Sequence, residues 1–250
     1  MSSIASSFGK AAQRYEQSAR LQREVALDTL PMLKDVPVGT LLDLGCGPGW
    51  FHSHLSTWCN ELWALDISPQ MLAKTQSQQI ATRLMLASAE QIPVAAESVD
   101  VVFSSLMLQW SSEPEQVFRE VYRVLKPGGK FVITTLVNGS LDEFHRAWQH
   151  AGYQSPALQF PETAAVVQLA RAAGLTVKAQ QKSYSWFFSD VFAVGREFKQ
   201  IGANYVAIRP QGLSGKARWQ AFAHAYEPFR TAAGLPLTYQ VLFLFGEKPR

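Results

Sequence analysis

The feature that most constrains this chain is the segment 41–50, LLDLGCGPGW. A short apolar run passes through alternating glycines and opens into an amphipathic stretch, which predicts a strand, a tight turn and the start of a helix. Gly45 and Gly47 allow positive φ and a close approach of the backbone to a ligand, and Gly49 adds freedom where the helix begins. Trp50 stands where a dinucleotide-binding loop would carry its third glycine. The segment therefore predicts a ligand-binding turn outside the dinucleotide pattern.

Strand and helix patterns alternate from residue 40 to residue 137. Alternation at this spacing is typical of βαβ units, so it predicts an α/β fold with a parallel sheet covered on both faces. The expected strands are Thr40–Leu44, Leu62–Asp66, Arg83–Ala87, Val99–Ser104 and Lys130–Val137. The expected helices between them are Trp50–Trp58, Pro69–Gln79 and Glu113–Leu125.

The two flanking parts differ from this core. Upstream, Phe8, Ala12, Tyr15 and Ala19 recur at helical spacing and predict a helix with one apolar face. Downstream, helices are expected at Leu141–His150, Thr163–Ala173, Val191–Ile201 and Lys216–Ala232, and strands at Thr176–Phe188 and Thr238–Gly246. We expect one domain in three parts, residues 1–37, 38–137 and 138–250.

The composition, 47% hydrophobic and 17% charged, is that of a soluble globular protein. No apolar run approaches the ~20 residues that a membrane span needs, and residues 1–8 lack the pattern of a signal peptide. Cys46 and Cys59 are therefore expected to be free thiols in a reducing cytoplasm. The five histidines are scattered, so we expect no metal site.

Asp66 is the second candidate for a ligand contact, at the end of the apolar run Leu62–Asp66. A carboxylate at the tip of the second strand lies beside the glycine loop and can accept hydrogen bonds from two vicinal hydroxyls, as ribose offers. The alternative is a turn or helix-capping role before Ser68-Pro69. We favour the ribose role because the glycine loop precedes it.

One further segment supports a ligand site at the same edge of the sheet, and another marks the start of the fifth strand. Residues 100–110, DVVFSSLMLQW, form a buried strand that ends in a polar loop, where open α/β sheets place ligand contacts. Residues 125–131, LKPGGKF, contain a helix stop before the fifth strand. Taken alone, the second of these is an ordinary turn.

Together these elements resemble the class I S-adenosylmethionine-dependent methyltransferases, whose motif I matches segment 41–50. A narrower resemblance, to the malonyl-acyl-carrier-protein O-methyltransferases of biotin synthesis, runs over nearly the whole chain. It is carried by the segments FGKAAQRYE (8–16), LQW (108–110), TTLVNGSL (134–141) and PLTY (236–239).

The resemblance implies a Rossmann-like fold with a mostly parallel seven-stranded sheet and an antiparallel C-terminal strand. Residues 1–37 would form a helical lid, 38–137 the S-adenosylmethionine-binding core, and 138–250 a helical substrate-binding insertion with the last strands. The implied cofactor contacts are Asp43, Gly45, Cys46, Gly47, Gly49, Asp66, Ile67, Ser88, Ala89, Glu90, Ser104 and Leu106. Ser88 and Ser105 replace the Asp and Asn that are commoner in the family, and a neutral Ser88 should bind the adenine amino group more weakly.

The implied reaction transfers a methyl group from S-adenosylmethionine to the free carboxylate of a malonyl thioester. The carboxylate is ionised at pH 7, with a reference pKa near ~4, so no general base is required. An unpaired carboxylate in a dry site is costly, so we expect a cation or donors to hold it. The candidates are Tyr15, Arg14, His145, Arg196 and Lys199. Arg196 and Lys199 share one helix face, which alternatively faces solvent.

Charge is distributed unevenly along the chain. Residues 1–137 hold 11 Lys and Arg against 13 Asp and Glu, and residues 138–250 hold 12 against 7, a balance of +5. A basic second part is compatible with an acidic partner such as malonyl-acyl carrier protein, or with ordinary surface scatter. The expected docking face includes Arg196, Lys199, Arg209 and Arg146.

Other functions remain open at this point. A second small-molecule methyltransferase, acting on a quinone, a sterol or another free acid, fits the glycine loop and Asp66 equally well. A non-catalytic S-adenosylmethionine-binding protein is a further alternative. We expect no nucleic-acid partner, because the basic residues are not clustered in runs, and we expect a monomer.

Overall fold

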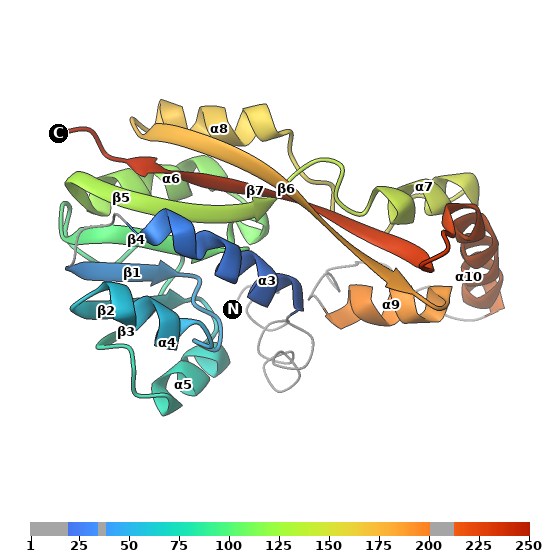
Figure 1. Ribbon diagram of the computed structural model, residues 1–250, viewed down its shortest axis with the longest axis horizontal. Helices are drawn as coiled ribbons and strands as arrows, with labels where there is room; N and C mark the ends of the chain where they lie inside the picture. The colour runs from blue at the N-terminus through green and yellow to red at the C-terminus, as the bar shows by residue number, and fades with distance from the viewer. Residues whose placement is uncertain (1–19, 35–38, 201–212) are drawn as a thin grey trace.

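The computed structural model describes residues 20–34, 39–200 and 213–250. Within them, a seven-stranded sheet has the order β3-β2-β1-β4-β5-β7-β6 (Figure 1). The parallel strands are β1 (Thr40–Leu44), β2 (Glu61–Asp66), β3 (Arg83–Leu86), β4 (Val99–Ser105) and β5 (Leu125–Leu136). The last strand, β7 (Leu235–Glu247), runs antiparallel to both β5 and β6 (Thr176–Phe188). The predicted fold class, a mostly parallel sheet with an antiparallel C-terminal strand, is confirmed.

The order of the strands reverses between β1 and β4. The chain runs outward from β1 to β3 and then returns to place β4 on the other side of β1. Loops that leave the carboxyl ends of β1 and β4 therefore diverge, and such a point is where open α/β sheets bind ligands. The buried Ser104 joins the two strand ends, because its hydroxyl donates to the carbonyl oxygen of Leu44 at 2.6 Å.

Helices cover both faces of the parallel part of the sheet. Helix α6 (Pro114–Val124) shows the physical reason: Val117, Val121 and Val124 are fully buried and recur every three or four residues, so one face of the helix packs on the sheet. No helix in the described ranges is long and apolar enough to cross a membrane. The other elements of this part are α3 (Arg20–Thr29), α4 (His52–Leu55), α5 (Pro69–Ser77), α8 (Thr163–Ala172) and the 3₁₀ turns η1 (Leu30–Leu33), η2 (Ser56–Trp58) and η3 (Leu108–Trp110).

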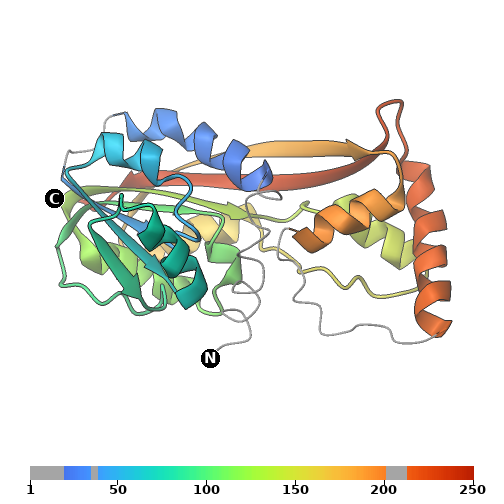
Figure 2. The same cartoon turned by 90° about the horizontal axis from the view of Figure 1, so that it is seen from below.

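The antiparallel pair of β6 and β7, which α9 and α10 separate in the chain, projects beyond the parallel sheet. All 13 residues of β6 pair with β7, whereas β5 pairs only with residues 241–247 of β7. Residues 235–240 of β7 therefore have a neighbouring strand on one side only. We call residues 235–240 of β7, their partners 183–188 of β6 and the helices gathered on them the hairpin arm (Figures 1 and 2). Its helices are α7 (Asp142–His150), α9 (Val191–Gln200) and α10 (Leu213–Tyr226), followed by the turn η4 (Glu227–Phe229).

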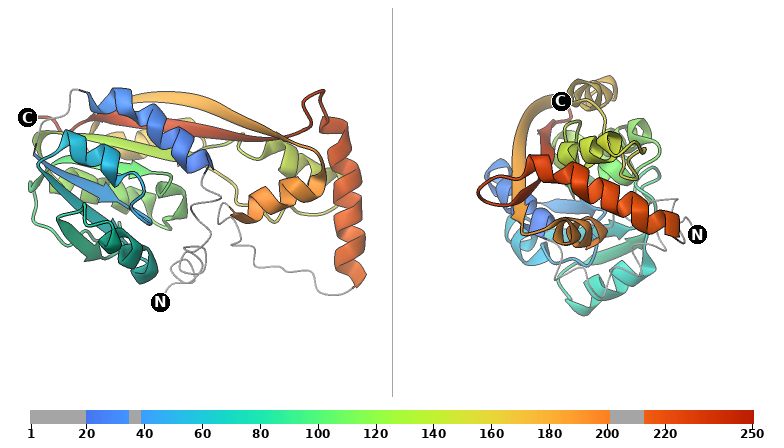
Figure 3. Two further views of the ribbon diagram at one scale, coloured as in Figure 1. Left: turned by 60° about the horizontal axis from the view of Figure 1, so that its bottom comes forward. Right: turned by 90° about the vertical axis from the view of Figure 1, so that its right-hand side faces the viewer.

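Aromatic side chains form the core of the hairpin arm. Trp148 of α7 stacks on Phe222 of α10 with ring centroids 4.5 Å apart, and the hydroxyl of Tyr226 donates to the carbonyl oxygen of Pro236 at 2.8 Å. Leu21 of α3 belongs to the same apolar cluster. Helix α3 is further fixed along the hairpin (Figure 3), because Asp28 accepts hydrogen bonds from the side chains of Lys182, at 2.6 Å, and Tyr184. The arm is thus joined to the sheet by β6, β7 and α3.

Several element boundaries differ from the expected ones. The helix expected at 50–58 is a short helix and a 3₁₀ turn, and the helix expected at 216–232 ends at Tyr226, because a turn at 231–234 leads into β7. Strand β5 begins at Leu125, which pairs with Val99 ahead of a bulge, and β7 begins at Leu235. Hydrogen bonding to neighbouring strands decides where β5 and β7 begin. The helix expected around Tyr15 lies outside the described residues.

Candidate functional site

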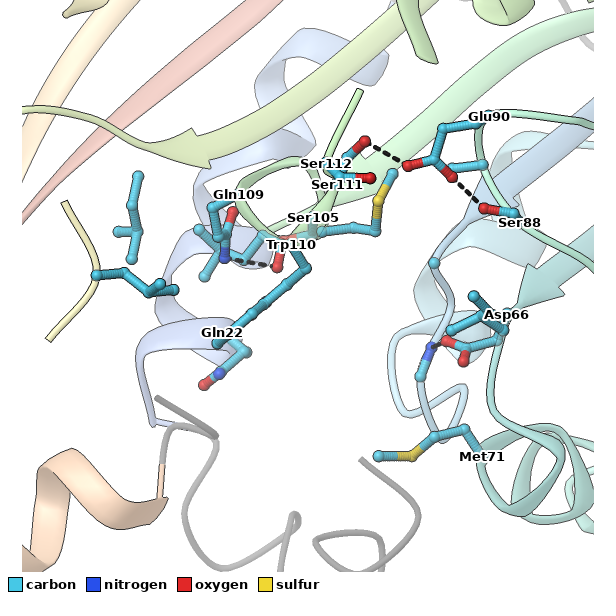
Figure 4. Close-up of a pocket in the computed structure, with 18 of the residues that line it drawn as sticks. Gln22, Asp66, Met71, Ser88, Glu90, Ser105, Gln109, Trp110, Ser111 and Ser112 are labelled. Carbon is cyan, nitrogen blue, oxygen red and sulfur yellow. Dashed lines mark hydrogen bonds between the residues drawn. The ribbon is translucent and has the colours of Figure 1, made fainter. Parts of the chain in front are cut away.

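A cavity of about 420 Å³ lies where the carboxyl ends of the parallel strands face the hairpin arm (Figure 4). We call its two parts the loop end and the arm end. The loop end is lined by Gly45, Gly47, Asp66, Ile67, Met71, Ser88, Ala89 and Glu90. The arm end is lined by Leu21, Gln22, Leu136, Leu141, Leu158, Phe160 and Tyr239. Figure 4 shows Asp66 and Gln22 on opposite sides of the cavity, with Gln109 and Trp110 on the side of Gln22.

The glycine loop presents bare backbone to the loop end. The N–H groups of Gly45 and Cys46 both donate to the carbonyl oxygen of Leu65, at 2.8 and 3.0 Å, which holds the loop against β2. Gly45 has φ +77°, and a Cβ there would lie 2.3 Å from Cγ of Met107. Gly47 has φ +55°, and a Cβ there would meet no atom within 4 Å. The backbone at Gly47 therefore faces open space that a ligand can occupy.

Asp66 fixes this loop and also offers acceptors. One carboxylate oxygen accepts from the N–H of Gly47 at 2.9 Å and the other from the N–H of Ser68 at 2.8 Å. Burial raises the pKa of Asp66, and these hydrogen bonds only partly oppose that effect. Each oxygen keeps a second lone pair, which a ligand hydroxyl can use. Helix α5 is capped by Ser68, whose hydroxyl accepts from the N–H of Met71 at 3.4 Å, and not by Asp66.

Carboxylates give the cavity a negative lining. Glu90 accepts hydrogen bonds from the hydroxyls of Ser88 and Ser111. Burial alone would raise the pKa of Glu90, but the hydrogen bonds from Ser111 and Ser88 outweigh it, so its pKa is lowered. In the described part of the chain, the carboxylate residues that line the cavity are Asp66, Glu90 and Glu113, and no Lys, Arg or His lines it. This lining favours a positively charged ligand.

The cavity wall contains two leucines with left-handed backbone. Leu106 has φ +52° and Leu141 has φ +60°, a conformation that is strained for a residue with a side chain. Each is held by its N–H: that of Leu106 donates to the carbonyl oxygen of Thr134 at 3.1 Å, and that of Leu141 to the carbonyl oxygen of Thr238 at 2.7 Å. The surrounding strands therefore fix the shape of the wall.

The structure brings most of the expected cofactor contacts together. Those that line the cavity are Gly45, Gly47, Asp66, Ile67, Ser88, Ala89, Glu90 and Leu106. Asp43, Cys46, Gly49 and Ser104 do not line it, and Ser105 does so in place of Ser104. Asp43 lies beneath the loop, with a carboxylate oxygen 3.0 Å from Nε2 of the buried His52. Burial is the main cause that raises the pKa of the Cys46 thiol well above its ordinary value, and the negative charges of Asp43 and Asp66 raise it further.

Of the expected contacts to a substrate carboxylate, the two with described side chains, His145 and Arg196, do not line the cavity. Arg14 and Tyr15 lie outside the described residues, as does the side chain of Lys199. Arg196 is exposed on α9 and does not line the cavity. His145 lies in the hairpin arm, where its Nδ1 is 2.8 Å from the hydroxyl of Ser155 and burial lowers its pKa. No group of three His, Cys, Asp or Glu residues in the described ranges could hold a metal ion.

Several lining residues were not expected from the sequence. Met71 and Ser111 follow the ends of β2 and β4, so their positions after strands could have indicated them, and Met107 lies within segment 100–110, where ligand contacts were expected. Leu158 and Phe160 lie in a segment without a helix or strand and carry no such signal. Tyr239 lies in segment 236–239 but has no chemical feature in the sequence that marks it as a site residue.

Comparisons with known proteins agree with this geometry. Residues 42–133 match the model of a methyltransferase domain family. The malonyl-acyl-carrier-protein O-methyltransferase of Herminiimonas arsenicoxydans is 36% identical and aligns with 98% of this chain and 95% of that protein. The biotin biosynthesis bifunctional protein BioHC of Cellvibrio japonicus is 40% identical over 98% of this chain, which spans 50% of that protein.

A solved structure shows the same fold. It is the phosphoethanolamine N-methyltransferase 2 of Haemonchus contortus in complex with S-adenosyl-L-methionine, with a TM-score of 0.59 and 18% identity. The alignment covers 97% of this chain and 57% of that chain. The loop end fits such a cofactor, since it combines an open glycine backbone, carboxylate acceptors and a negative lining suited to a sulfonium cation.

Replacement of Asp66 tests the loop end. We expect Asp66→Ala to weaken S-adenosylmethionine binding about 10- to 150-fold, or about 1.5–3 kcal/mol, because two charge-assisted hydrogen bonds to ribose are lost. Titration calorimetry measures the change. Glu61→Ala removes a carboxylate from the other end of the same strand and should leave the affinity unchanged. Unaltered binding in a folded Asp66→Ala variant would contradict the ribose role.

Proposed function

The chain belongs to the malonyl-acyl-carrier-protein O-methyltransferase family, and we propose that it methylates the free carboxylate of malonyl-acyl carrier protein. The product is the methyl ester that primes pimeloyl chain synthesis in biotin biosynthesis. The observation that carries the proposal is one cavity with two kinds of lining, negative at the loop end and largely apolar at the arm end. Such a cavity suits a cationic methyl donor beside a short acyl chain.

At the loop end, the backbone of Gly47 and the side chains of Asp66 and Glu90 would hold S-adenosylmethionine. When bound, this cofactor supplies a methyl group on a positively charged sulfur, which an oxygen nucleophile can take by displacement. The contribution of the chain is to bind and orient. Asp66 supplies acceptors for hydroxyls, and Ile67 and Met71 supply apolar surface.

At the arm end, the chain holds the acceptor and excludes water. Leu136, Leu141, Leu158 and Phe160 provide an apolar wall. A carboxylate in such surroundings is poorly solvated, which favours its reaction with a cation because the two charges cancel. A carboxylate already ionised at neutral pH requires no general base. Correct placement of the two reactants is therefore the main task of these residues.

We assign different roles to the three parts of the chain. Residues 38–137 supply the loop end, and residues 138–250 supply most of the arm end. Residues 1–37 are proposed to form a lid, and the described portion that supports this role is α3, whose Leu21 and Gln22 line the cavity.

The direct test is detection of the product by mass spectrometry. Incubation of the protein with S-adenosylmethionine and malonyl-acyl carrier protein should add one methyl group to the malonyl moiety. Acetyl-acyl carrier protein, which has the thioester but no free carboxylate, should gain none. Methylation of a quinone, a sterol or another free acid, without methylation of malonyl-acyl carrier protein, would contradict the proposal.

The dependence of the rate on pH tests the absence of a general base. We expect kcat to be flat from about pH 6 to 8, because a carboxylate with a pKa near ~4 stays ionised throughout. Affinity for S-adenosylmethionine should fall toward low pH, since Asp66 loses its charge as the pH drops through its raised pKa. Kinetics over pH 5–9 measure both quantities. A bell-shaped kcat profile that disappears on replacing one histidine would contradict the mechanism.

The acidic carrier protein is proposed to dock on the outer end of the hairpin arm. Arg196 is exposed on α9, and Arg146 of α7 is about half exposed, with its guanidinium 3.4 Å from Asp142. Phe192, 59% exposed, lies one helical turn from Arg196 and adds an apolar contact. Lys199 and Arg209 were expected on the same face, and their side chains lie outside the described residues. Charges of this kind mainly accelerate the encounter of the partners.

Charge reversal tests this docking face. Arg196→Glu with Lys199→Glu should lower kcat/KM for malonyl-acyl carrier protein at least tenfold and leave S-adenosylmethionine affinity unchanged. Malonyl-CoA, which lacks the protein surface, should be affected less. The matched control is Arg171→Glu with Lys178→Glu, on α8 and the other end of β6. If kcat/KM for malonyl-acyl carrier protein falls equally in both double variants, or falls in neither, the carrier protein docks elsewhere.

A further inference from the structure

Tyr239 carries a buried hydroxyl that has no hydrogen-bond partner in the described part of the chain. Its side chain is 1% exposed, it lines the arm end of the cavity, and its hydroxyl forms no hydrogen bond with any residue in the described ranges. Buried polar groups are nearly always satisfied, so an unsatisfied one needs an explanation, and at a cavity wall a ligand can supply the missing partner.

Tyr226 provides an internal comparison. It is also fully buried in the hairpin arm, but its hydroxyl donates to the carbonyl oxygen of Pro236 at 2.8 Å, and it does not line the cavity. The arm therefore satisfies the tyrosine that lies away from the cavity and leaves unsatisfied the one that borders it. The indole N–H groups of Trp148 and Trp219, which do not line the cavity, also lack partners in the described ranges, so the position of Tyr239 at the cavity is what distinguishes it.

A second unsatisfied group reaches the arm end from another element. Oε1 of Gln22, on α3, is buried and has no hydrogen-bond partner within the part of the chain that the structure describes. A half-turn of the amide exchanges its oxygen and nitrogen, so this side chain can donate as well as accept. Two neutral polar groups from distant parts of the sequence thus border the same apolar space.

The charges around the cavity determine which ligand these groups suit. No Lys, Arg or His side chain of the described residues lines the cavity. A substrate carboxylate at the arm end must therefore find neutral donors there, since unpaired burial of a charge is costly. Burial, reinforced by Glu197, Tyr226 and Glu143, raises the pKa of Tyr239 well above its ordinary value, so the hydroxyl remains a donor.

We propose that the Tyr239 hydroxyl donates a hydrogen bond to the malonyl carboxylate and positions it for methyl transfer, with Gln22 as a second neutral donor. This inference rests on the proposed function. A neutral donor also suits the chemistry. A fixed cation would stabilise the carboxylate more than the transition state, in which its charge is being lost, whereas a hydroxyl holds the oxygen with a smaller penalty.

Tyr239→Phe is the decisive variant. We expect kcat/KM for malonyl-acyl carrier protein to fall about 10- to 100-fold, because a hydrogen bond to a charged group is lost. S-adenosylmethionine affinity should not change. The melting temperature should stay the same or rise, since the hydroxyl that is removed has no partner in the folded protein.

Two controls separate positioning from structure. Tyr226→Phe should lower the melting temperature, because its hydrogen bond to Pro236 is lost, and should keep kcat/KM. Acetyl-acyl carrier protein, used as a competitive inhibitor, should inhibit wild type and Tyr239→Phe equally, because it has no carboxylate.

Three results would overturn the inference. They are an unchanged kcat/KM in Tyr239→Phe, an equal weakening of malonyl-acyl carrier protein as substrate and of acetyl-acyl carrier protein as inhibitor, and a joint loss of melting temperature and cofactor affinity. Failure of the wild type to produce the methyl ester would instead overturn the proposed function, which keeps the two failures distinct.

Discussion

The register of β7 between its two neighbours is the constraint on which the rest of the structure depends. Strand β7 pairs with β6 along its whole length but with β5 only over residues 241–247, so residues 235–240 extend past the parallel sheet. One face of this extension is buried, by aromatic side chains of α7 and α10 and by Val191 and Val194 of α9. The cavity lies between this arm and the strand ends because the extension runs past them.

The charges within the cavity complement the two reactants of the proposed reaction. The loop end offers carboxylates, which favour a sulfonium cation, and the arm end offers apolar side chains with neutral polar groups. A buried cation at the arm end would bind a carboxylate more tightly but would also oppose the loss of its charge. The arrangement found here leaves the cofactor as the source of positive charge, and catalysis then depends on placement and on the exclusion of water.

Local sequence patterns determined most of the parallel sheet. Apolar runs such as Thr40–Leu44 became strands, and the valines of α6 became its buried face, because burial follows a periodicity that short segments already carry. The boundaries that differed, at Leu125 and Leu235, are set by hydrogen bonds to strands distant in sequence. The local sequence pattern holds no information about such long-range pairing, so the extent of the hairpin arm could not be predicted from the sequence.

The site also has one part that local sequence patterns determine and one part that long-range packing determines. The sequence by itself determined the loop end, because Gly45 and Gly47 lie in the turn after β1, Asp66 is the last residue of β2, and the carboxyl ends of neighbouring parallel strands meet at one edge. Only the tertiary structure decided the arm end. Gln22, Leu158 and Tyr239 lie more than 80 residues apart in the chain, and they share one cavity because α3 and the paired strands β6 and β7 are packed across it. Whether a tyrosine hydroxyl is satisfied depends on that packing, which no local pattern contains.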